Sequence, residues 1–169
     1  MTKRVFKVYN LKDILTLILS ILITEGVGFL SAIISGNIGS NNDFYNTLNK
    51  PSFSPPAGVF RIVWPILYLL MGIAFYRIIK LREENIDIKL PVTLYIIQLI
   101  LNFLWSIIFF RFNSIKCAFI EIIILFIFII LTILEFRKYD RKAALLMIPY
   151  AIWVAFAIYL NYSILMLNM

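Results

Sequence analysis

Five apolar runs make up most of the chain, and short polar or charged segments separate them. Each run approaches or reaches the roughly 20 residues that a helix needs to cross a bilayer. The pattern therefore predicts an all-α integral membrane protein, a five-transmembrane-helix bundle forming a single domain over residues 1–169. The predicted helices span residues 14–35, 57–80, 91–110, 115–136 and 143–167.

The connection at residues 36–56, between the first two predicted helices, is rich in turn-forming residues and proline. Pro51, Pro55 and Pro56 fix their own φ angles and keep the preceding residues out of the helical region. The sequence therefore predicts a stiff, extended segment that covers one end of the bundle and a ligand beneath it. The alternative is that the prolines only end one helix and begin the next.

Polar and aromatic side chains recur at helical spacing in three of the predicted helices, so each helix presents them on one face. The second helix carries Trp64, Tyr68 and Met71, the third carries Gln98, Asn102, Trp105 and Phe109, and the fifth carries Tyr150, Trp153, Ala157 and Asn161. If these stripes face one another, they enclose an aromatic cavity whose amides can orient a flat, largely apolar ligand. The same spacing is equally compatible with plain helix packing and with aromatics at the membrane interface.

The first helix carries a carboxyl group, Glu25, close to two glycines. A carboxyl within the membrane is a candidate functional group, because it is costly unless it faces the protein interior or finds a partner. An interfacial position or a hydrogen bond between helices is the alternative. Gly26 and Gly28 are predicted to let a neighbouring backbone approach closely.

Composition and charge narrow the classes of function. The chain is 62% hydrophobic with a mean hydropathy of +0.93, and it has no histidine and one cysteine, Cys117. We therefore expect no metal site and no cofactor, and no histidine-based catalytic triad. Twelve of the 16 lysines and arginines fall on one side of a five-helix topology. The positive-inside rule then places the N-terminus in the cytoplasm and residues 36–56 outside, so membrane topology explains the net charge of +7 without nucleic acid.

Three ordered blocks of residues after position 43 resemble the TspO family, which includes bacterial tryptophan-rich sensory proteins and the mitochondrial translocator protein. The blocks are Tyr45, Leu48, Lys50, Pro51, Pro55, Pro56, Trp64, Leu67, Tyr68, Met71 and Gly72, then QLILNFLWSIIFF at 98–110, then PYAIWVAFAIYLN at 149–161. The resemblance implies a multi-pass protein of the bacterial cell membrane, surrounded by lipid and commonly a homodimer. It also implies a pocket beneath the first loop for porphyrins such as protoporphyrin IX and for benzodiazepine- or isoquinoline-type ligands.

The resemblance assigns roles to particular residues. Trp64 and Trp153 match the family's two pocket tryptophans, which some bacterial members use in light-dependent breakdown of porphyrin. Asn102 matches the asparagine that hydrogen-bonds the ligand. Together with the stripes and the loop, the predicted ligand-binding residues are Tyr45, Phe53, Pro55, Trp64, Tyr68, Gln98, Asn102, Trp105, Trp153, Ala157 and Asn161.

Departures from the family pattern and the competing functions complete the sequence prediction. Phe44 and Phe53 stand where many members have tryptophan. The cholesterol-recognition pattern of animal members is not completed after Tyr162, so the resemblance does not extend to cholesterol binding. The leading function is a membrane receptor or carrier for porphyrins in tetrapyrrole or stress handling. The alternatives are an enzyme that degrades porphyrin with light and oxygen, for which Trp64 and Trp153 are the candidate reactive residues, and a transporter of small solutes.

Overall fold

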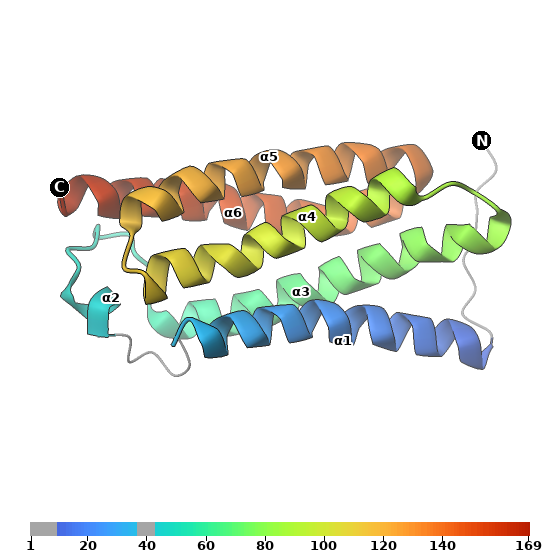
Figure 1. The fold of residues 1–169 in the computed structure, drawn as a ribbon, viewed down its shortest axis with the longest axis horizontal. Helices are drawn as coiled ribbons and strands as arrows, with labels where there is room; N and C mark the ends of the chain where they lie inside the picture. The colour runs from blue at the N-terminus through green and yellow to red at the C-terminus, as the bar shows by residue number, and fades with distance from the viewer. Residues whose placement is uncertain (1–9, 37–42) are drawn as a thin grey trace.

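The computed structural model describes residues 10–36 and 43–169, and in this part of the chain five long helices form an elongated bundle (Figure 1). The long helices are α1 (Leu11–Ile34), α3 (Ala57–Ile79), α4 (Lys89–Ser106), α5 (Ile115–Tyr139) and α6 (Arg141–Leu167). A short helix α2 (Asp43–Thr47), a 3-10 turn η1 (Lys80–Glu84) and a π-helical turn η2 (Ile107–Arg111) complete the elements. Each long helix, extended by its adjoining turn where there is one, is long and apolar enough to cross a membrane, which confirms the predicted fold class.

The observed helix bounds differ from the predicted ones mainly at the ends, where capping side chains decide them. Asn10 caps α1, because its side-chain Oδ1 accepts a hydrogen bond of 2.9 Å from the backbone N–H of Asp13. Asp140 caps α6 in the same way, accepting from the backbone N–H groups of Lys142 and Ala143. Both helices therefore begin two or three residues earlier than the hydrophobic pattern indicated.

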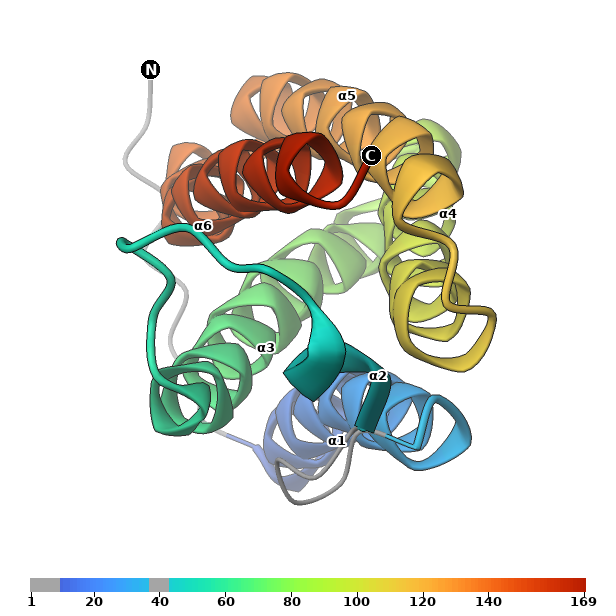
Figure 2. The same ribbon diagram turned by 90° about the vertical axis from the view of Figure 1, so that its left-hand side faces the viewer.

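The five long helices close into a ring in the order α1, α3, α6, α5, α4 and back to α1. Figure 2 views this ring from the end that carries α2 and the segment leading to α3. That segment crosses the end of the bundle, as predicted for the proline-rich connection, although α2 was not expected there. The described lysines and arginines gather mostly at the other end, while Lys3, Arg4 and Lys7 lie outside the described residues. Which side of the membrane this end faces stays a prediction.

Aromatic stacking and hydrogen bonds between helices hold the middle of the bundle together. Phe75 of α3 and Tyr95 of α4 stack with ring centroids 4.1 Å apart. The Tyr95 hydroxyl also lies 2.8 Å from Oγ1 of Thr24 in α1, and Ser31 of α1 donates a 2.9 Å hydrogen bond to the carbonyl of Phe103. Since apolar burial drives little association between helices within lipid, such polar contacts and close packing carry the specificity.

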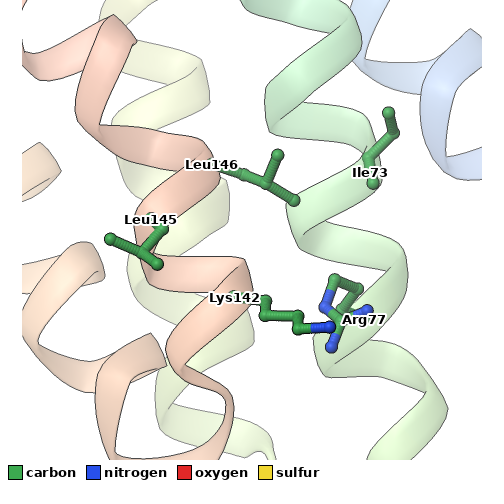
Figure 3. A pocket seen from close by; sticks show the side chains of 5 residues that line it. All are labelled: Ile73, Arg77, Lys142, Leu145 and Leu146. Carbon is green, nitrogen blue, oxygen red and sulfur yellow. The ribbon is translucent and has the colours of Figure 1, made fainter. Parts of the chain in front are cut away.

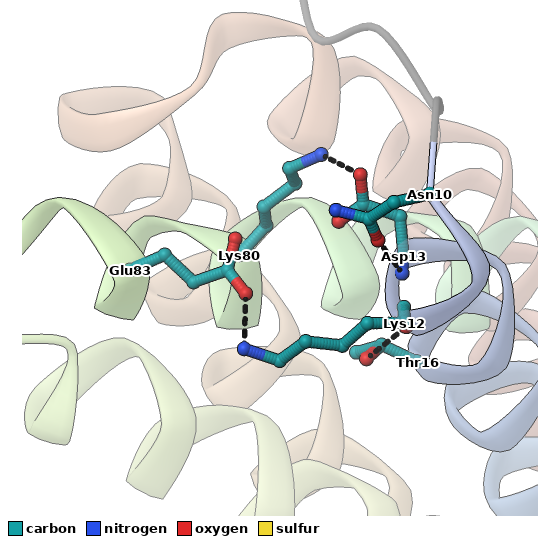
Figure 4. A network of polar contacts seen from close by, with 6 residues as sticks. All are labelled: Asn10, Lys12, Asp13, Thr16, Lys80 and Glu83. Carbon is teal, nitrogen blue, oxygen red and sulfur yellow. Dashed lines mark hydrogen bonds and ion pairs between the residues drawn. The ribbon is translucent and has the colours of Figure 1, made fainter.

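Ion pairs join α1 to η1, the turn that follows α3 at the end of the bundle where the cations gather (Figure 4). Lys12 lies 2.9 Å from a carboxylate oxygen of Glu83, and Lys80 lies 2.8 Å from one of Asp13. These pairs sit at the end of the bundle, where water and lipid headgroups can solvate the remaining charge.

Glycine allows α1 and α3 to approach closely, but not at every position that the sequence predicted. A Cβ on Gly72 would lie 2.7 Å from the Cα of Ile21, so the two backbones touch there. Gly28 lies against the ring of Tyr68 rather than against a backbone, so a methyl group there would collide with the tyrosine ring. A Cβ on Gly26 meets nothing within 4 Å, so the prediction of close packing at Gly26 was wrong.

This difference gives a matched test of helix packing. We expect Gly72→Ala to lower the free energy of unfolding by about 1–3 kcal/mol, because the added methyl forces α1 and α3 apart. Gly26→Ala should be neutral or slightly stabilising, since alanine favours the helix by up to about 1 kcal/mol over glycine and the methyl meets no neighbour. Unfolding in detergent measures both, and equal destabilisation would contradict the assignment of Gly72 as the contact.

Candidate aromatic binding site

The three predicted stripes face one another inside the ring of helices, and an asparagine joins them. Asn102 of α4 accepts a hydrogen bond of 2.5 Å from the Tyr68 hydroxyl of α3 and donates one of 3.0 Å to the Tyr150 hydroxyl of α6. All three side chains are buried. We call this arrangement the Asn102 clasp, because a single amide side chain sets how α3, α4 and α6 are oriented toward one another.

The three tryptophans lie about one turn from the clasp, toward the end covered by residues 43–56. Trp64 precedes Tyr68 by four residues in a helix that runs away from this end, whereas Trp105 and Trp153 follow Asn102 and Tyr150 by three residues in helices that run toward it. Trp64 stacks on Tyr68 with centroids 5.5 Å apart. All three tryptophans pack against the central apolar cluster, and whether they line one ligand site stays a prediction.

Further aromatic rings surround the tryptophans. The Trp105 ring stacks on Phe109 at 5.3 Å, and the Trp153 ring meets the edge of Phe60 at 5.6 Å. Trp105 packs against both apolar clusters of the bundle, the large central one and a smaller one near the covered end. Ala157 of α6 is partly buried and packs on the central cluster. The site is thus lined by π faces and small apolar groups, which suit a flat apolar ligand.

Several buried polar groups along these helices have no hydrogen-bond partner among the described residues. Both side-chain polar atoms of Gln98, Glu121 and Asn161 are unpartnered, as are the indole nitrogens of Trp105 and Trp153. Gln98 is fully buried, and Asn161 and Glu121 are only 2% and 8% exposed. Buried polar groups in proteins are nearly always paired, so this concentration is typical of a site that receives a polar molecule or the polar part of a ligand.

The predicted amides occupy different positions relative to the clasp. Asn161 lies beyond the tryptophans toward the covered end, because it follows Trp153 by eight residues in α6. Gln98 lies one turn from Asn102 toward the opposite end, so the clasp separates it from the tryptophans. Asn102 itself already serves two tyrosines and retains one acceptor site and one donor hydrogen for a ligand.

Two groups in this region were missing from the predicted ligand-binding residues. Glu121 lies in α5 on the face that carries the buried Ala118, Ile122 and Leu125. A carboxyl in an otherwise apolar span was the signal that could have selected it. Glu25 of α1, which the sequence did single out, is only partly buried.

The covering segment is pinned to the C-terminal end of α6 by a reciprocal pair of asparagines. The backbone N–H of Asn49 donates to Oδ1 of Asn168 at 3.0 Å, and Nδ2 of Asn168 donates to the Asn49 carbonyl at 2.9 Å. Nothing in the pattern of either segment indicated this contact, because the two residues are 119 positions apart.

Tyr45, Phe53 and Pro55, the loop residues predicted to line the site, lie at different positions in the structure. The Tyr45 ring contacts Phe109 and Phe110 at about 6 Å between centroids, so it closes the aromatic cluster from above. Phe53 is 40% exposed and stacks at 5.0 Å on Tyr159, which is itself exposed, so Phe53 lies at the outer rim. Pro55 is partly buried.

The fold and site define a multi-pass α-helical membrane protein with a tryptophan-lined interior beneath a pinned loop. The model of the TspO/MBR family matches residues 20–167 of the chain. The chain belongs to this family, and the match includes most of the first helix, where the sequence resemblance had not been recognised.

Named relatives come from bacteria, archaea and animals. The chain is 41% identical to tryptophan-rich protein TspO of Chlorobaculum tepidum, over 93% of this chain and 98% of the relative. It is 38% identical to tryptophan-rich protein TspO of Archaeoglobus fulgidus, over 92% and 99% of the two chains. The translocator protein of Homo sapiens is 33% identical over 75% of each chain.

Because Asn102 is hydrogen-bonded and Asn161 has no partner among the described residues, the same substitution to leucine should change stability differently at the two positions. Asn102→Leu should lower the free energy of unfolding by about 1–3 kcal/mol, because it leaves two buried tyrosine hydroxyls without a partner. Asn161→Leu should be neutral or stabilising in ligand-free protein, because no hydrogen bond is lost. Unfolding of both variants in detergent checks this, and equal losses would show that Asn161 has a partner in the fold.

Proposed function

We propose that this chain is a membrane receptor or carrier that binds porphyrins of the protoporphyrin type in the aromatic site beneath residues 43–56, in tetrapyrrole or stress handling. Benzodiazepine- and isoquinoline-type molecules are flat, largely apolar ligands of the same class. The observation that carries the proposal is the arrangement of Trp64, Trp105 and Trp153 around one interior, with unpartnered polar atoms beside them. Relatives named as sensory and translocator proteins support a binding role rather than a purely structural one.

The chemistry of the site fits a metal-free tetrapyrrole. Tryptophan and tyrosine faces stack on a planar π system, with each contact contributing about 0.5–1.5 kcal/mol beyond area burial. The side-chain N–H groups of Asn161, Trp105 and Trp153 have no partner among the described residues and are donors for the propionate carboxylates of a porphyrin. Since the chain contains no histidine, an iron porphyrin would find no imidazole ligand, so a metal-free porphyrin is the better match.

Titration of protoporphyrin IX into detergent-purified protein in the dark, followed by tryptophan quenching, tests this function. We expect saturable binding that weakens about tenfold in the Trp64→Phe/Trp153→Phe double variant, because smaller rings and lost N–H groups reduce the contacts. Asn161→Leu should also weaken binding while leaving the fold intact.

Tyr162→Phe is the matched control, because Tyr162 lies in the same helix as Trp153 but is exposed on the outer surface. It should bind porphyrin as the wild type does. Quenching that never saturates, or that is unchanged in the double variant, would mean that the porphyrin only partitions into the micelle.

A second candidate function is light- and oxygen-dependent degradation of the bound porphyrin. It is favoured by the indole of Trp153, whose buried N–H has no partner within the described residues and whose ring lies in the aromatic cluster. Illumination of the complex in air should then bleach the porphyrin spectrum, and Trp153→Phe should stop the bleaching while affinity stays within about tenfold. An unchanged spectrum would favour binding alone, and bleaching at the wild-type rate in Trp153→Phe would remove this tryptophan as the reacting group.

The homodimer that the family resemblance implies and the cytoplasmic N-terminus that the charge distribution predicts belong to the same proposal. A dimer with residues 43–56 facing outward would present the aromatic site on the external side of the membrane in both copies.

A further inference from the structure

A hollow separate from the aromatic site lies between α3 and α6, at the end of the bundle where the cations gather (Figure 3). It is lined by Ile73 and Arg77 from α3 and by Lys142, Leu145 and Leu146 from α6. None of these residues belongs to the porphyrin site, which is at the other end of the same two helices.

Two cations line this hollow, and one of them is held in place. The Arg77 guanidinium lies 2.6 Å from Oδ2 of Asp140, and both side chains are largely buried. Asp140 is itself fixed, because its other carboxylate oxygen caps α6. Lys142 is exposed at the first turn of α6 and forms no ion pair with the described residues. Two cations and one carboxylate leave a net positive charge of about one at the hollow.

The apolar side chains of the hollow lie deeper in the membrane than its cations. Ile73 precedes Arg77 by four residues in a helix that runs toward this end, so it sits one turn deeper. Leu145 and Leu146 follow Lys142 by three and four residues in a helix that runs away from this end, so they also sit one turn deeper. The hollow therefore has cations at its mouth, near the membrane surface, and apolar side chains at its floor. A phospholipid has the same order, with its headgroup at the surface and its acyl chains below.

We propose that this hollow is a binding site for an anionic phospholipid, with the phosphate at Arg77 and Lys142 and an acyl chain along Ile73, Leu145 and Leu146. Basic pockets between membrane helices recognise acidic headgroups through this combination of charge and apolar surface. A soluble phosphate would use only the cationic mouth. In the hollow between α1 and the end of α3, by contrast, Lys12 and Lys80 are each paired with a carboxylate.

The test compares lipid binding by wild type and charge variants of the purified protein in mixed micelles, with bound lipid counted by native mass spectrometry. We expect phosphatidylglycerol to bind saturably, one molecule per chain, in preference to phosphatidylcholine. Lys142→Gln should weaken this binding about fivefold, and Lys142→Arg should restore it, because the attraction comes from one positive charge near the headgroup.

Arg141→Gln is the matched control, since Arg141 is also exposed in the first turn of α6 but does not line the hollow. It should leave the affinity unchanged. Equal binding of the two lipids, or an equal loss in Arg141→Gln, would overturn the proposal. Full competition by millimolar inorganic phosphate would also overturn it, because that result assigns the site to a soluble anion. None of these measurements depends on porphyrin binding.

Discussion

The hydrogen bonds of the Asn102 clasp are the constraint on which the arrangement of the bundle depends. Within hydrocarbon an amide has no water to bind, so its partners must come from the protein. Here they come from Tyr68 and Tyr150 on two other helices. Rotating α3, α4 or α6 out of register would leave at least two of these groups unpaired. Because a tryptophan lies one turn from each clasp residue, the same hydrogen bonds also set the three indoles at a similar height along the bundle, against the central apolar cluster.

The clasp divides the interior into two unlike parts. On one side, toward the charged end, the Phe75 and Tyr95 rings stack and Thr24 pairs with the Tyr95 hydroxyl. Ser20 and Gln98 on this side keep buried polar atoms without a hydrogen-bond partner among the described residues. On the other side, unpartnered groups accumulate on α4, α5 and α6 beneath the segment that Asn49 and Asn168 pin in place. The candidate aromatic site therefore lies on the covered side of the clasp.

The two ends of the bundle are held by different forces. At the charged end, ion pairs join α1 to α3 and α3 to α6, where partial solvation by water and headgroups limits the cost of burying charge. At the covered end, aromatic contacts and the asparagine pair attach the loop to α6. Relatives from bacteria, archaea and animals align over most of this chain.

The number of membrane helices, their approximate bounds and the faces that carry the tryptophans could be predicted from the sequence, because hydrophobic length and helical period are local properties of the chain. The blocks that identify the family are also local. Which polar groups are paired, by contrast, became known from the packing of the helices. Asn102 and Asn161 look alike along their helices, yet one joins two tyrosines and the other has no partner, since pairing depends on neighbours from other helices. The contacts of Asn49 with Asn168, of Gly72 with Ile21 and of Arg77 with Asp140 are likewise set by the order of the helices in the ring, which no local pattern encodes.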